Sequence, residues 1–262
     1  MAEPVEITDP DDPRLDDFRG LADADVRPDR RGVVIAEGVS VVQRLLASPY
    51  RVRAIAGVPG KLAALGPVLA TTRGPVYAVG KWVLSDAVGF RVTRGLLASA
   101  DRLPAPDIGE LIRRSGRTAV LESLNDFENL GALFRNAAAF GIDAVLLDPR
   151  TADPLYRRSV RVSMGHVLGV PFAVLPGPWP QSLDLLRAAG VQLLALTPAG
   201  DTVLRSVQPA ARWAVLLGAE GLGLTAGVLA AADLRVRIPM AGAVDSLNVA
   251  TAAAVAFAHL LG

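Results

Sequence analysis

The sequence contains no cysteine. Disulfide bonds, a thiolate zinc site and a cysteine nucleophile are therefore excluded, and the absence is typical of a protein that works in a reducing cytoplasm. Histidine is almost as scarce. His166 and His259 lie far apart in the sequence, so we expect both to be structural and expect no metal centre.

Long uncharged apolar runs are also missing. The longest, residues 246–262, is Ala-rich, carries His259 and falls short of the ~20 residues that span a bilayer. The N-terminal segment MAEPVEITDPDDP is acidic and lacks the basic and apolar blocks of a signal peptide. We therefore expect a cytoplasmic protein without a membrane partner.

Neither sign of charge is in excess, because 27 basic residues face 26 acidic ones and the net charge is +1. Lysine is nearly absent, since Lys61 and Lys81 are the only two. An RNA partner would therefore have to be bound by a local basic patch rather than by a polycationic chain. With 262 residues, of which 51% are hydrophobic, the chain is long enough for one large or two modest folded domains.

The first ~100 residues alternate between short strand-like and helix-like stretches. The pattern predicts strands at residues 32–36, 51–56, 76–79 and 96–99, and helices at 14–22 and 37–47. We interpret residues 1–103 as a small α/β domain. Residues 104–116 are rich in Pro and Arg around a short amphipathic piece, 108–113, and are expected to form a linker.

The alternation becomes stronger in residues 117–262. Apolar runs predict strands at 118–122, 144–147, 172–175, 192–196, 213–217 and 235–238, and amphipathic or small-residue stretches predict helices at 129–140, 181–189, 226–231 and 247–261. Apolar strands separated by helices are typical of a parallel sheet that is covered on both faces. The second domain is therefore expected to be an α/β domain with a parallel sheet.

Three segments of this second domain combine Gly-rich or Asn-rich turns with apolar runs: NDFENLGALFRNAAAFG (125–141), LLGAEGLGL (216–224) and IPMAGAVDSLNVATAAAVAFAHLL (238–261). The last two contain turns directly after predicted strands, where parallel sheets bind ligands. A Rossmann oxidoreductase is disfavoured, because GAEGLG is not GxGxxG, lies late in the chain and has no suitable acidic residue following it.

The order and content of these segments resemble the SpoU/TrmH family of RNA ribose 2′-O-methyltransferases. Asn129, Gly131 and Arg135 match the first family motif, and residues 218–223 match its Gly-x-Glu-Gly-x-Gly turn. Residues 238–249 match Ile-Pro-Met-x-Gly followed by Ser-Leu-Asn-Val. The resemblance is close over the last half of the chain and looser over the first ~100 residues.

The resemblance implies a C-terminal trefoil-knot methyltransferase domain, in which the last strands and helix thread through an earlier loop, an exception to the rule against knots. It also implies a smaller N-terminal RNA-binding domain, a homodimer formed through the C-terminal domain, and S-adenosylmethionine as cofactor. The residues expected to bind the cofactor are Thr197, Pro198, Gly218, Glu220, Gly221, Ile238, Met240 and Leu247. Read alone, the glycines could be turn residues, and Ile238 and Leu247 could be core residues.

Arg135 lies off the apolar stripe of its helix, which comprises Leu130, Leu133, Phe134, Ala137 and Ala138, so packing does not explain it. Unless it is simply solvated, the resemblance makes Arg135 the central catalytic residue, acting on the target ribose and its phosphate. The pKa of arginine, above ~12, makes it a difficult base. We therefore expect it to clamp the phosphate and orient the hydroxyl.

The resemblance gives Asn129, Glu220, Ser246 and Asn248 supporting catalytic roles. Asn129 and Ser246 could equally be helix caps, which are common uses of these residue types. Glu220 is the sharper candidate, because a carboxylate inside a glycine turn has little structural purpose unless it binds something.

Arg157, Arg158 and Arg161 fall within about one helical turn, before a Ser-x-Gly that similar family segments share. They form either a solvated face or an RNA phosphate contact. Residues 32–46 resemble the strand and helix of the family's RNA-holding domain, so Arg27, Arg30 and Arg31 just before them are also expected phosphate contacts.

We therefore predict an enzyme that methylates a ribose 2′-hydroxyl in RNA, with ribosomal RNA as the expected substrate. The alternatives are a transfer RNA substrate, an antibiotic-resistance enzyme that modifies one nucleotide of large-subunit ribosomal RNA, and a non-catalytic RNA-binding protein. Departures from the residues commoner in the family occur at Phe127, Asn136, Ala219, Asp245 and Ala250. These departures leave the catalytic set intact and bear on substrate choice and pocket shape.

Overall fold

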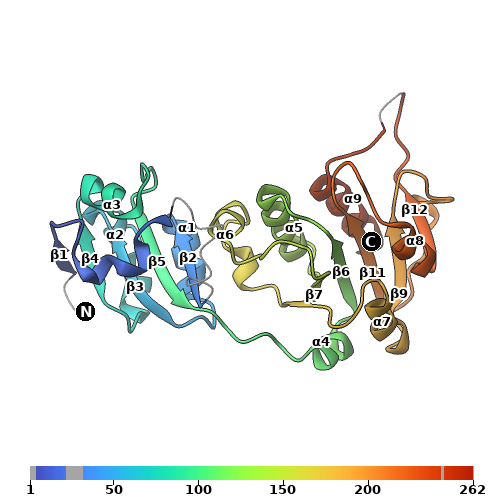
Figure 1. Ribbon diagram of the computed structural model, residues 1–262, viewed down its shortest axis with the longest axis horizontal. Helices are drawn as coiled ribbons and strands as arrows, with labels where there is room; N and C mark the ends of the chain where they lie inside the picture. Colours follow the sequence, from blue (N-terminus) through green and yellow to red (C-terminus); the bar gives the residue numbers. More distant parts are fainter. Residues whose placement is uncertain (1–3, 22–31, 243–244, 262) are drawn as a thin grey trace. The chain divides into compact units, whose positions relative to one another are not determined.

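The computed structural model of the protein describes residues 4–21, 32–242 and 245–261. The chain folds into two compact units, coloured along the chain in Figure 1: unit 1 comprises residues 1–104 and 154–169, and unit 2 comprises residues 105–153 and 170–262. Each unit is an α/β fold, which confirms the predicted class.

The unit boundaries differ from the expected ones in two places. Residues 104–116, expected as a linker, contain helix α4 (Ile108–Arg114), and its Leu111 and Ile112 are buried in the core of unit 2. Residues 154–169 were expected in the second domain but fold with unit 1. Both differences come from tertiary burial, which the local sequence pattern does not report.

Unit 1 is built on a five-stranded sheet with the order β1-β4-β3-β5-β2. β5 runs antiparallel to both of its neighbours, whereas β1, β3 and β4 pair in parallel. The strands are β1 (Val5–Ile7), β2 (Val33–Glu37), β3 (Val52–Gly57), β4 (Val76–Val79) and β5 (Leu96–Asp101). The helices are α1 (Val39–Leu46), α2 (Pro59–Ala63), α3 (Lys81–Val88) and α6 (Arg157–Val162).

The helix expected at residues 14–22 is a shorter 3-10 helix, Pro13–Phe18. The side chain of Asp12 caps it by accepting a hydrogen bond from the backbone N–H of Arg14. Leu15 and Phe18 of this helix are buried with the inner side of α3 in one apolar cluster. This burial fixes the chain entering unit 1 onto one face of its sheet.

Unit 2 is built on a seven-stranded sheet with the order β10-β12-β9-β11-β6-β7-β8, and all of its strand pairs are parallel, as the sequence predicts. The strands are β6 (Arg117–Glu122), β7 (Ala144–Leu147), β8 (Phe172–Val174), β9 (Gln192–Leu196), β10 (Thr202–Val203), β11 (Trp213–Gly218) and β12 (Leu234–Arg237). The remaining helices are α5 (Phe127–Ala139), α7 (Asp184–Ala188), α8 (Ala226–Ala231) and α9 (Val249–Leu261).

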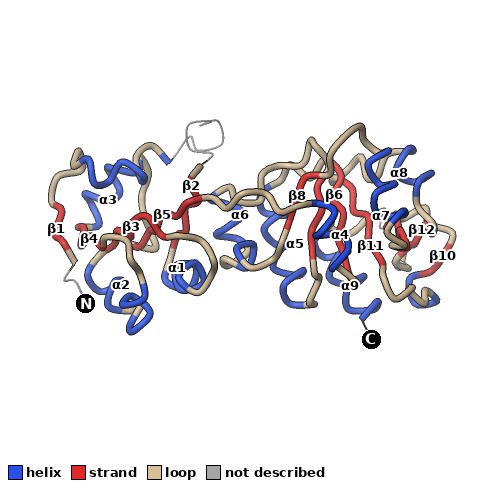
Figure 2. The backbone as a smooth tube through the Cα atoms, turned by 90° about the horizontal axis from the view of Figure 1, so that it is seen from below, coloured by secondary structure: helices blue, strands red, loops and turns tan. Residues whose placement is uncertain are grey.

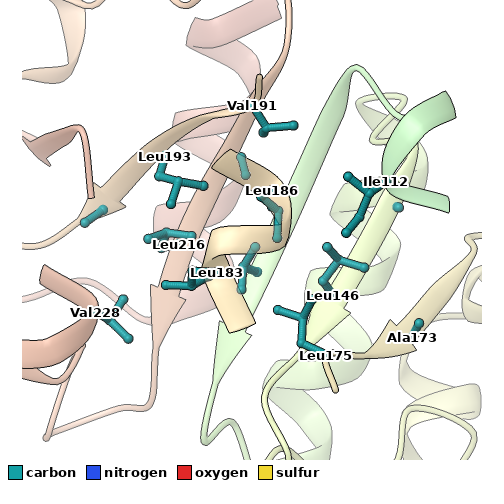
Figure 3. Packing of buried hydrophobic residues seen from close by; sticks show 14 of the residues in the cluster. Ile112, Leu146, Ala173, Leu175, Leu183, Leu186, Val191, Leu193, Leu216 and Val228 are labelled. Carbon is teal, nitrogen blue, oxygen red and sulfur yellow. The ribbon is translucent and has the colours of Figure 1, made fainter. Parts of the chain in front are cut away.

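Helices cover both faces of this sheet. On one face, α4, α7 and α8 contribute Ile112, Leu186 and Val228 to a core that includes Leu146 and Leu216 of the sheet (Figure 3). On the other face, α5 and α9 lie side by side (Figure 2). A sheet buried on both sides explains why its strands read as continuous apolar runs rather than as alternating ones.

Among the described residues, every helix is too short or too polar to traverse a lipid bilayer. In the same part of the chain, no three His, Asp or Glu side chains gather in a way that would ligate a metal ion.

Candidate functional site

A cavity of about 740 Å³ lies in unit 2 at the carboxyl ends of strands β9, β11 and β12. These strands are neighbours in the parallel sheet, so the loops that follow them meet at one edge, as expected for a ligand site. The volume falls within the ~300–1,000 Å³ typical of small-molecule pockets. The lining residues are Leu196, Thr197, Pro198, Leu217–Leu224, Leu229, Ile238, Met240, Asp245–Val249 and Ala252.

All of the residues expected to bind the cofactor line this cavity. Thr197 and Pro198 follow β9, residues 218–221 form the turn after β11, and Ile238 and Met240 follow β12. Leu247 precedes α9. The structure thus gathers into one cavity wall the segments that the sequence predicted to act together.

The glycine turn after β11 is possible only with glycine at particular positions. A Cβ atom on Gly218 would lie 2.3 Å from the carbonyl carbon of Gly223, which is closer than atoms can approach. Gly221 (φ 81°) and Gly223 (φ 67°) adopt left-handed backbone conformations, which cost glycine little. The backbone N–H of Gly223 donates to the carbonyl of Ala219 at 2.9 Å. The turn is therefore tight and leaves Glu220 and Leu222 exposed at its tip.

Asn248 joins the three sequence motifs through hydrogen bonds. Its side-chain Nδ2 donates to Glu220 Oε1 at 2.6 Å and to Asn129 Oδ1 at 2.7 Å. Its Oδ1 accepts from the backbone N–H groups of Ala250 (3.1 Å) and Thr251 (3.2 Å), which makes Asn248 the N-cap of α9. One side chain thus holds the glycine turn, helix α5 and helix α9 in register at the cavity rim.

Neither Asn129 nor Ser246, the two residues considered as helix caps from the sequence, caps a helix in the structure. Asp126, not Asn129, caps α5, because its Oδ1 accepts from the N–H groups of Glu128 (2.9 Å) and Asn129 (2.8 Å). Likewise Asn248 rather than Ser246 caps α9. The amide of Asn129 is therefore available for Asn248, and Ser246 is an exposed residue of the cavity lining.

Arg135 lies on the exposed side of α5, whereas Leu130, Leu133, Phe134 and Ala137 of the apolar stripe are buried. Its guanidinium makes no hydrogen bond or ion pair with any described residue, and Arg135 is not among the residues that line the cavity. As far as the described residues go, its donors therefore remain available to a group from outside this chain.

The basic residues expected to contact RNA have different surroundings. Arg157 is turned inward within unit 1: it pairs with the buried Glu37 at 2.9 Å and lies 4.4 Å from the centroid of the Phe90 ring. Arg158 is exposed and Arg161 is half-buried. Arg27, Arg30 and Arg31 lie outside the described residues.

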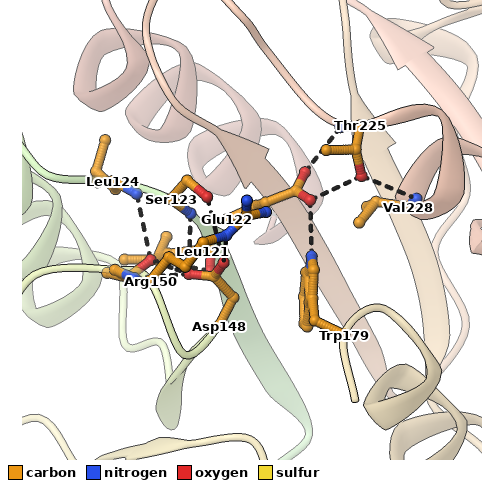
Figure 4. Close-up of polar contacts among 10 residues, drawn as sticks. Leu121, Glu122, Ser123, Leu124, Asp148, Arg150, Trp179, Thr225 and Val228 are labelled. Atoms are coloured by element: carbon orange, nitrogen blue, oxygen red, sulfur yellow. Dashed lines mark hydrogen bonds and ion pairs between the residues drawn. The ribbon is translucent and has the colours of Figure 1, made fainter.

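Glu122, which sequence reasoning missed, is a buried carboxylate at the end of β6, only 2% exposed. Its Oε1 accepts from Trp179 Nε1 and from Thr225 Oγ1, both at 2.7 Å, and its Oε2 accepts from the Thr225 N–H at 2.8 Å (Figure 4). Thr225 directly follows the glycine turn and caps α8. Glu122 therefore anchors the far end of that turn to the sheet.

Asp148 directly follows β7 and is fully buried (Figure 4). Like Glu122, it anchors a loop that follows a strand. It accepts from the backbone N–H of Ser123 at 2.9 Å, and from the N–H and hydroxyl of Thr151 at 2.8 and 2.6 Å. Ser123 has φ 56°, an uncommon conformation for a residue other than glycine. Asp148 thus stabilises the bend that leads from β6 into α5. In the sequence, both carboxylates could have been found as acidic residues at the end of an apolar strand or directly after it.

The model of the SpoU rRNA Methylase family matches residues 116–258. The chain belongs to this family. A protein of Mycobacterium tuberculosis, named an uncharacterized tRNA/rRNA methyltransferase, is 50% identical over 259 residues, covering 96% of this chain and 90% of the relative. The Bacillus subtilis 23S rRNA (guanosine(2553)-2′-O)-methyltransferase RlmP is 31% identical over 153 residues, covering 58% of this chain and 61% of that protein.

Solved structures of SpoU-like proteins share the fold. An AdoMet-bound rRNA methyltransferase from Sinorhizobium meliloti matches with a TM-score of 0.81 at 27% identity, covering 97% of this chain and 96% of that one. The SpoU methyltransferase AviRb from Streptomyces viridochromogenes, at 22% identity, matches in fold with a TM-score of 0.80 over 95% of this chain and 97% of that one. The protein is accordingly an RNA methyltransferase of the SpoU family with the fold of its solved relatives, and the trefoil knot stays a prediction.

Proposed function

We propose that the protein transfers a methyl group from S-adenosylmethionine to a ribose 2′-hydroxyl of ribosomal RNA. The observation that carries the proposal is the meeting of Glu220, Asn129 and Asn248 at the rim of the cavity that the glycine turn lines. The name of the Bacillus subtilis relative supports the 2′-hydroxyl and the ribosomal substrate. The Mycobacterium tuberculosis relative, named for both tRNA and rRNA, keeps transfer RNA as the second candidate.

The cavity residues fit the proposed cofactor. A tight glycine turn exposes backbone N–H and C=O groups, which can bind the polar parts of a nucleoside, and Leu217, Ile238 and Leu247 offer apolar surface for a base. When bound, S-adenosylmethionine supplies a methyl group on a sulfonium, which is a good leaving group. Positioning of the acceptor oxygen is therefore the main task left to the protein.

The polar residues at the rim can perform that positioning. Glu220 and Asn129 are held by the amide of Asn248, so their remaining acceptor and donor atoms are fixed in direction before RNA arrives. Ser246, on the same rim, offers a further hydroxyl to the acceptor ribose. Such preorganised groups lower the entropic cost of aligning the 2′-hydroxyl.

Arg135 is the residue that we assign to the phosphate beside the target ribose. Arginine stays protonated at ordinary pH, so it clamps the phosphate and orients the hydroxyl rather than removing its proton. Because Arg135 does not line the cavity of its own chain, we propose a homodimer, formed through unit 2, in which Arg135 of the partner subunit serves the site. The exposed Arg158 is proposed as an additional RNA phosphate contact.

Replacement of Arg135 tests the proposal. Arg135→Ala should abolish methyl transfer while the affinity for S-adenosylmethionine, measured by calorimetry, stays within about twofold, because the residue lies outside the cavity. Arg135→Lys, which keeps the charge but loses the bidentate geometry, should retain a small part of the activity. Equal activity of Arg135→Ala and the wild type would refute the assignment. Ribose-methylation mapping across total RNA, with and without the protein, would identify the substrate nucleotide.

A further inference from the structure

Unit 1 carries a shallow, open hollow of about 740 Å³ that shares no residue with the site described above. It lies between α3 and the loop that follows this helix, and is lined by Lys81, Trp82, Ser85, Asp86, Gly89, Phe90 and Arg91. We call this feature the Trp82 groove. Trp82 is 71% exposed, although a ring of this size is usually buried at least in part. An aromatic ring that is exposed to solvent beside a surface hollow is a candidate contact for a ligand.

The groove is held in shape by hydrogen bonds within unit 1. Ser85 Oγ donates to the carbonyl of Lys81 at 2.7 Å and accepts from the backbone N–H of Val92 at 3.1 Å. The loop that carries Arg91 is thereby tied back to α3. Gly89, with φ 80°, ends the helix and allows the chain to reverse.

A buried ion pair fixes the other wall of the groove. The guanidinium of Arg157 lies 4.4 Å from the ring centroid of Phe90, and the same guanidinium pairs with Glu37. Phe90 is thus packed against a cation that is itself held in place. The backbone of the groove and the Phe90 ring are therefore held in place, which lowers the cost of binding a ligand there.

The lining of the groove is chemically suited to a nucleotide. Trp82 and Phe90 are its apolar side chains, and both are flat aromatic rings on which a base can stack. Lys81 and Arg91 are exposed and have no ion-pair partner among the described residues. Two cations beside a free indole face can bind a phosphate and stack a base.

We propose that the Trp82 groove binds an unpaired nucleotide of the RNA substrate, separate from the nucleotide that is methylated. The base stacks on Trp82, while Lys81 and Arg91 bind the adjacent phosphate and Asp86 accepts a hydrogen bond from a base amino group or a ribose hydroxyl. The inference rests on the proposed function only in taking RNA as the ligand. It assigns Trp82, Lys81 and Arg91 of unit 1 to a single-stranded segment of the RNA substrate.

Binding of a labelled eight-nucleotide single-stranded RNA to the full chain, measured by fluorescence anisotropy, tests the proposal. Trp82→Ala should weaken binding about tenfold, and Trp82→Phe, which keeps a smaller stacking face, should weaken it less. Lys81→Ala and Arg91→Ala should each lower the salt dependence of binding by about one phosphate contact. Lys61→Ala is the matched control, because Lys61 is the chain's other lysine and lies outside the groove.

A second measurement separates this proposal from the proposed function. Calorimetry should give the same S-adenosylmethionine affinity for Trp82→Ala as for the wild type, because the groove and the unit 2 cavity share no residue. Unchanged RNA affinity in Trp82→Ala would overturn the groove assignment. That result would not bear on the proposed methyl transfer. Conversely, a wild type without methyl transfer would overturn the proposed function, whereas a loss of RNA binding in Trp82→Ala would still support the groove.

Discussion

Glu37 and Glu122 occupy the same place in their respective units. Each is the last residue of an apolar strand, β2 or β6, and each is 2% exposed. Glu37 binds a guanidinium, that of Arg157. Glu122 accepts hydrogen bonds from neutral donors, the indole of Trp179 and the N–H and hydroxyl of Thr225. The same local pattern therefore produces a buried ion pair in one unit and a neutral-donor network in the other.

The difference follows from what each carboxylate has to hold. Glu37 binds Arg157, which lies 120 positions away in sequence, and this charge pair acts together with the Arg44–Met164 hydrogen bond to hold segment 154–169 in unit 1. Glu122 instead holds the Trp179 indole and Thr225, which directly follows the cavity-lining turn, through three directional hydrogen bonds. A buried acid at a strand end therefore predicts an anchoring role, but not the chemistry of its partner.

The largest effect is expected for Glu122→Ala. The substitution leaves the indole N–H of Trp179 and both donors of Thr225 without their acceptor, and each unsatisfied buried donor costs ~1–3 kcal/mol, so we expect a loss of about 4 kcal/mol in the free energy of unfolding. Affinity for S-adenosylmethionine should fall as well, because the glycine turn loses its anchor. Denaturant unfolding and calorimetry measure the two losses.

Glu122→Gln is the control for this change. It keeps the volume and one acceptor oxygen, so it should lose about half as much stability, since its amide group faces an N–H donor in place of the second oxygen. A wild-type unfolding midpoint for Glu122→Ala, with unchanged cofactor affinity, would contradict the anchoring role.

A somewhat smaller effect is expected for Glu37→Ala. Removing one partner of a buried ion pair costs ~3–5 kcal/mol, and we expect about 3 kcal/mol because Arg157 keeps 16% side-chain exposure. In a double-mutant cycle, Arg157→Ala made on top of Glu37→Ala should cost less than Arg157→Ala alone. Additive losses in the cycle would show that the ion pair does not couple segment 154–169 to β2.

Two substitutions at the rim of the cavity should lower the stability of the protein by different amounts. Asn248→Ala removes both the α9 cap and the bonds to Glu220 and Asn129, whereas Asn129→Ala spares the cap. We therefore expect Asn248→Ala to cost ~1 kcal/mol more stability than Asn129→Ala. Both should reduce kcat, and thermal unfolding with steady-state kinetics distinguishes them. Equal stability of the two variants would show that Asn248 contributes no capping energy.

Ser123→Gly is expected to have the smallest effect. Glycine removes the cost of the left-handed backbone at this position but makes the unfolded chain more flexible, and the N–H bond to Asp148 is retained. Stability should change by less than about 1 kcal/mol. Ser123→Val, whose branched side chain disfavours φ 56°, should be clearly destabilised, and a neutral result for valine would show that the bend is unstrained.

Much of the architecture could be predicted from the sequence, because apolar runs report burial directly. The parallel sheet of unit 2 and its principal helices followed from local pattern, whereas the cavity-lining residues after β9, β11 and β12 followed from the family resemblance. The helix expected at residues 181–189 is divided into a 3-10 turn, Gln181–Leu183, and α7, a detail that periodicity does not resolve.

The contacts that escaped prediction are those set by partners distant in the chain. Arg157 was considered as an RNA phosphate contact, but it pairs with Glu37, which lies 120 positions earlier in the sequence. Asn129 was a plausible cap by composition, yet Asp126 was equally suitable and the structure uses it. The catalytic role of Arg135 stays a prediction, because its guanidinium contacts no polar group among the described residues that would indicate its ligand.

The chain crosses between its two units at residues 104–105, 153–154 and 169–170. A single cleavage or gene split near residue 104 would consequently yield two incomplete fragments: the first would lack Arg157, and the second would carry α6 without the strand that it covers. A unit 2 joined to a different N-terminal domain would therefore carry residues 154–169, a segment that packs in unit 1 of this chain.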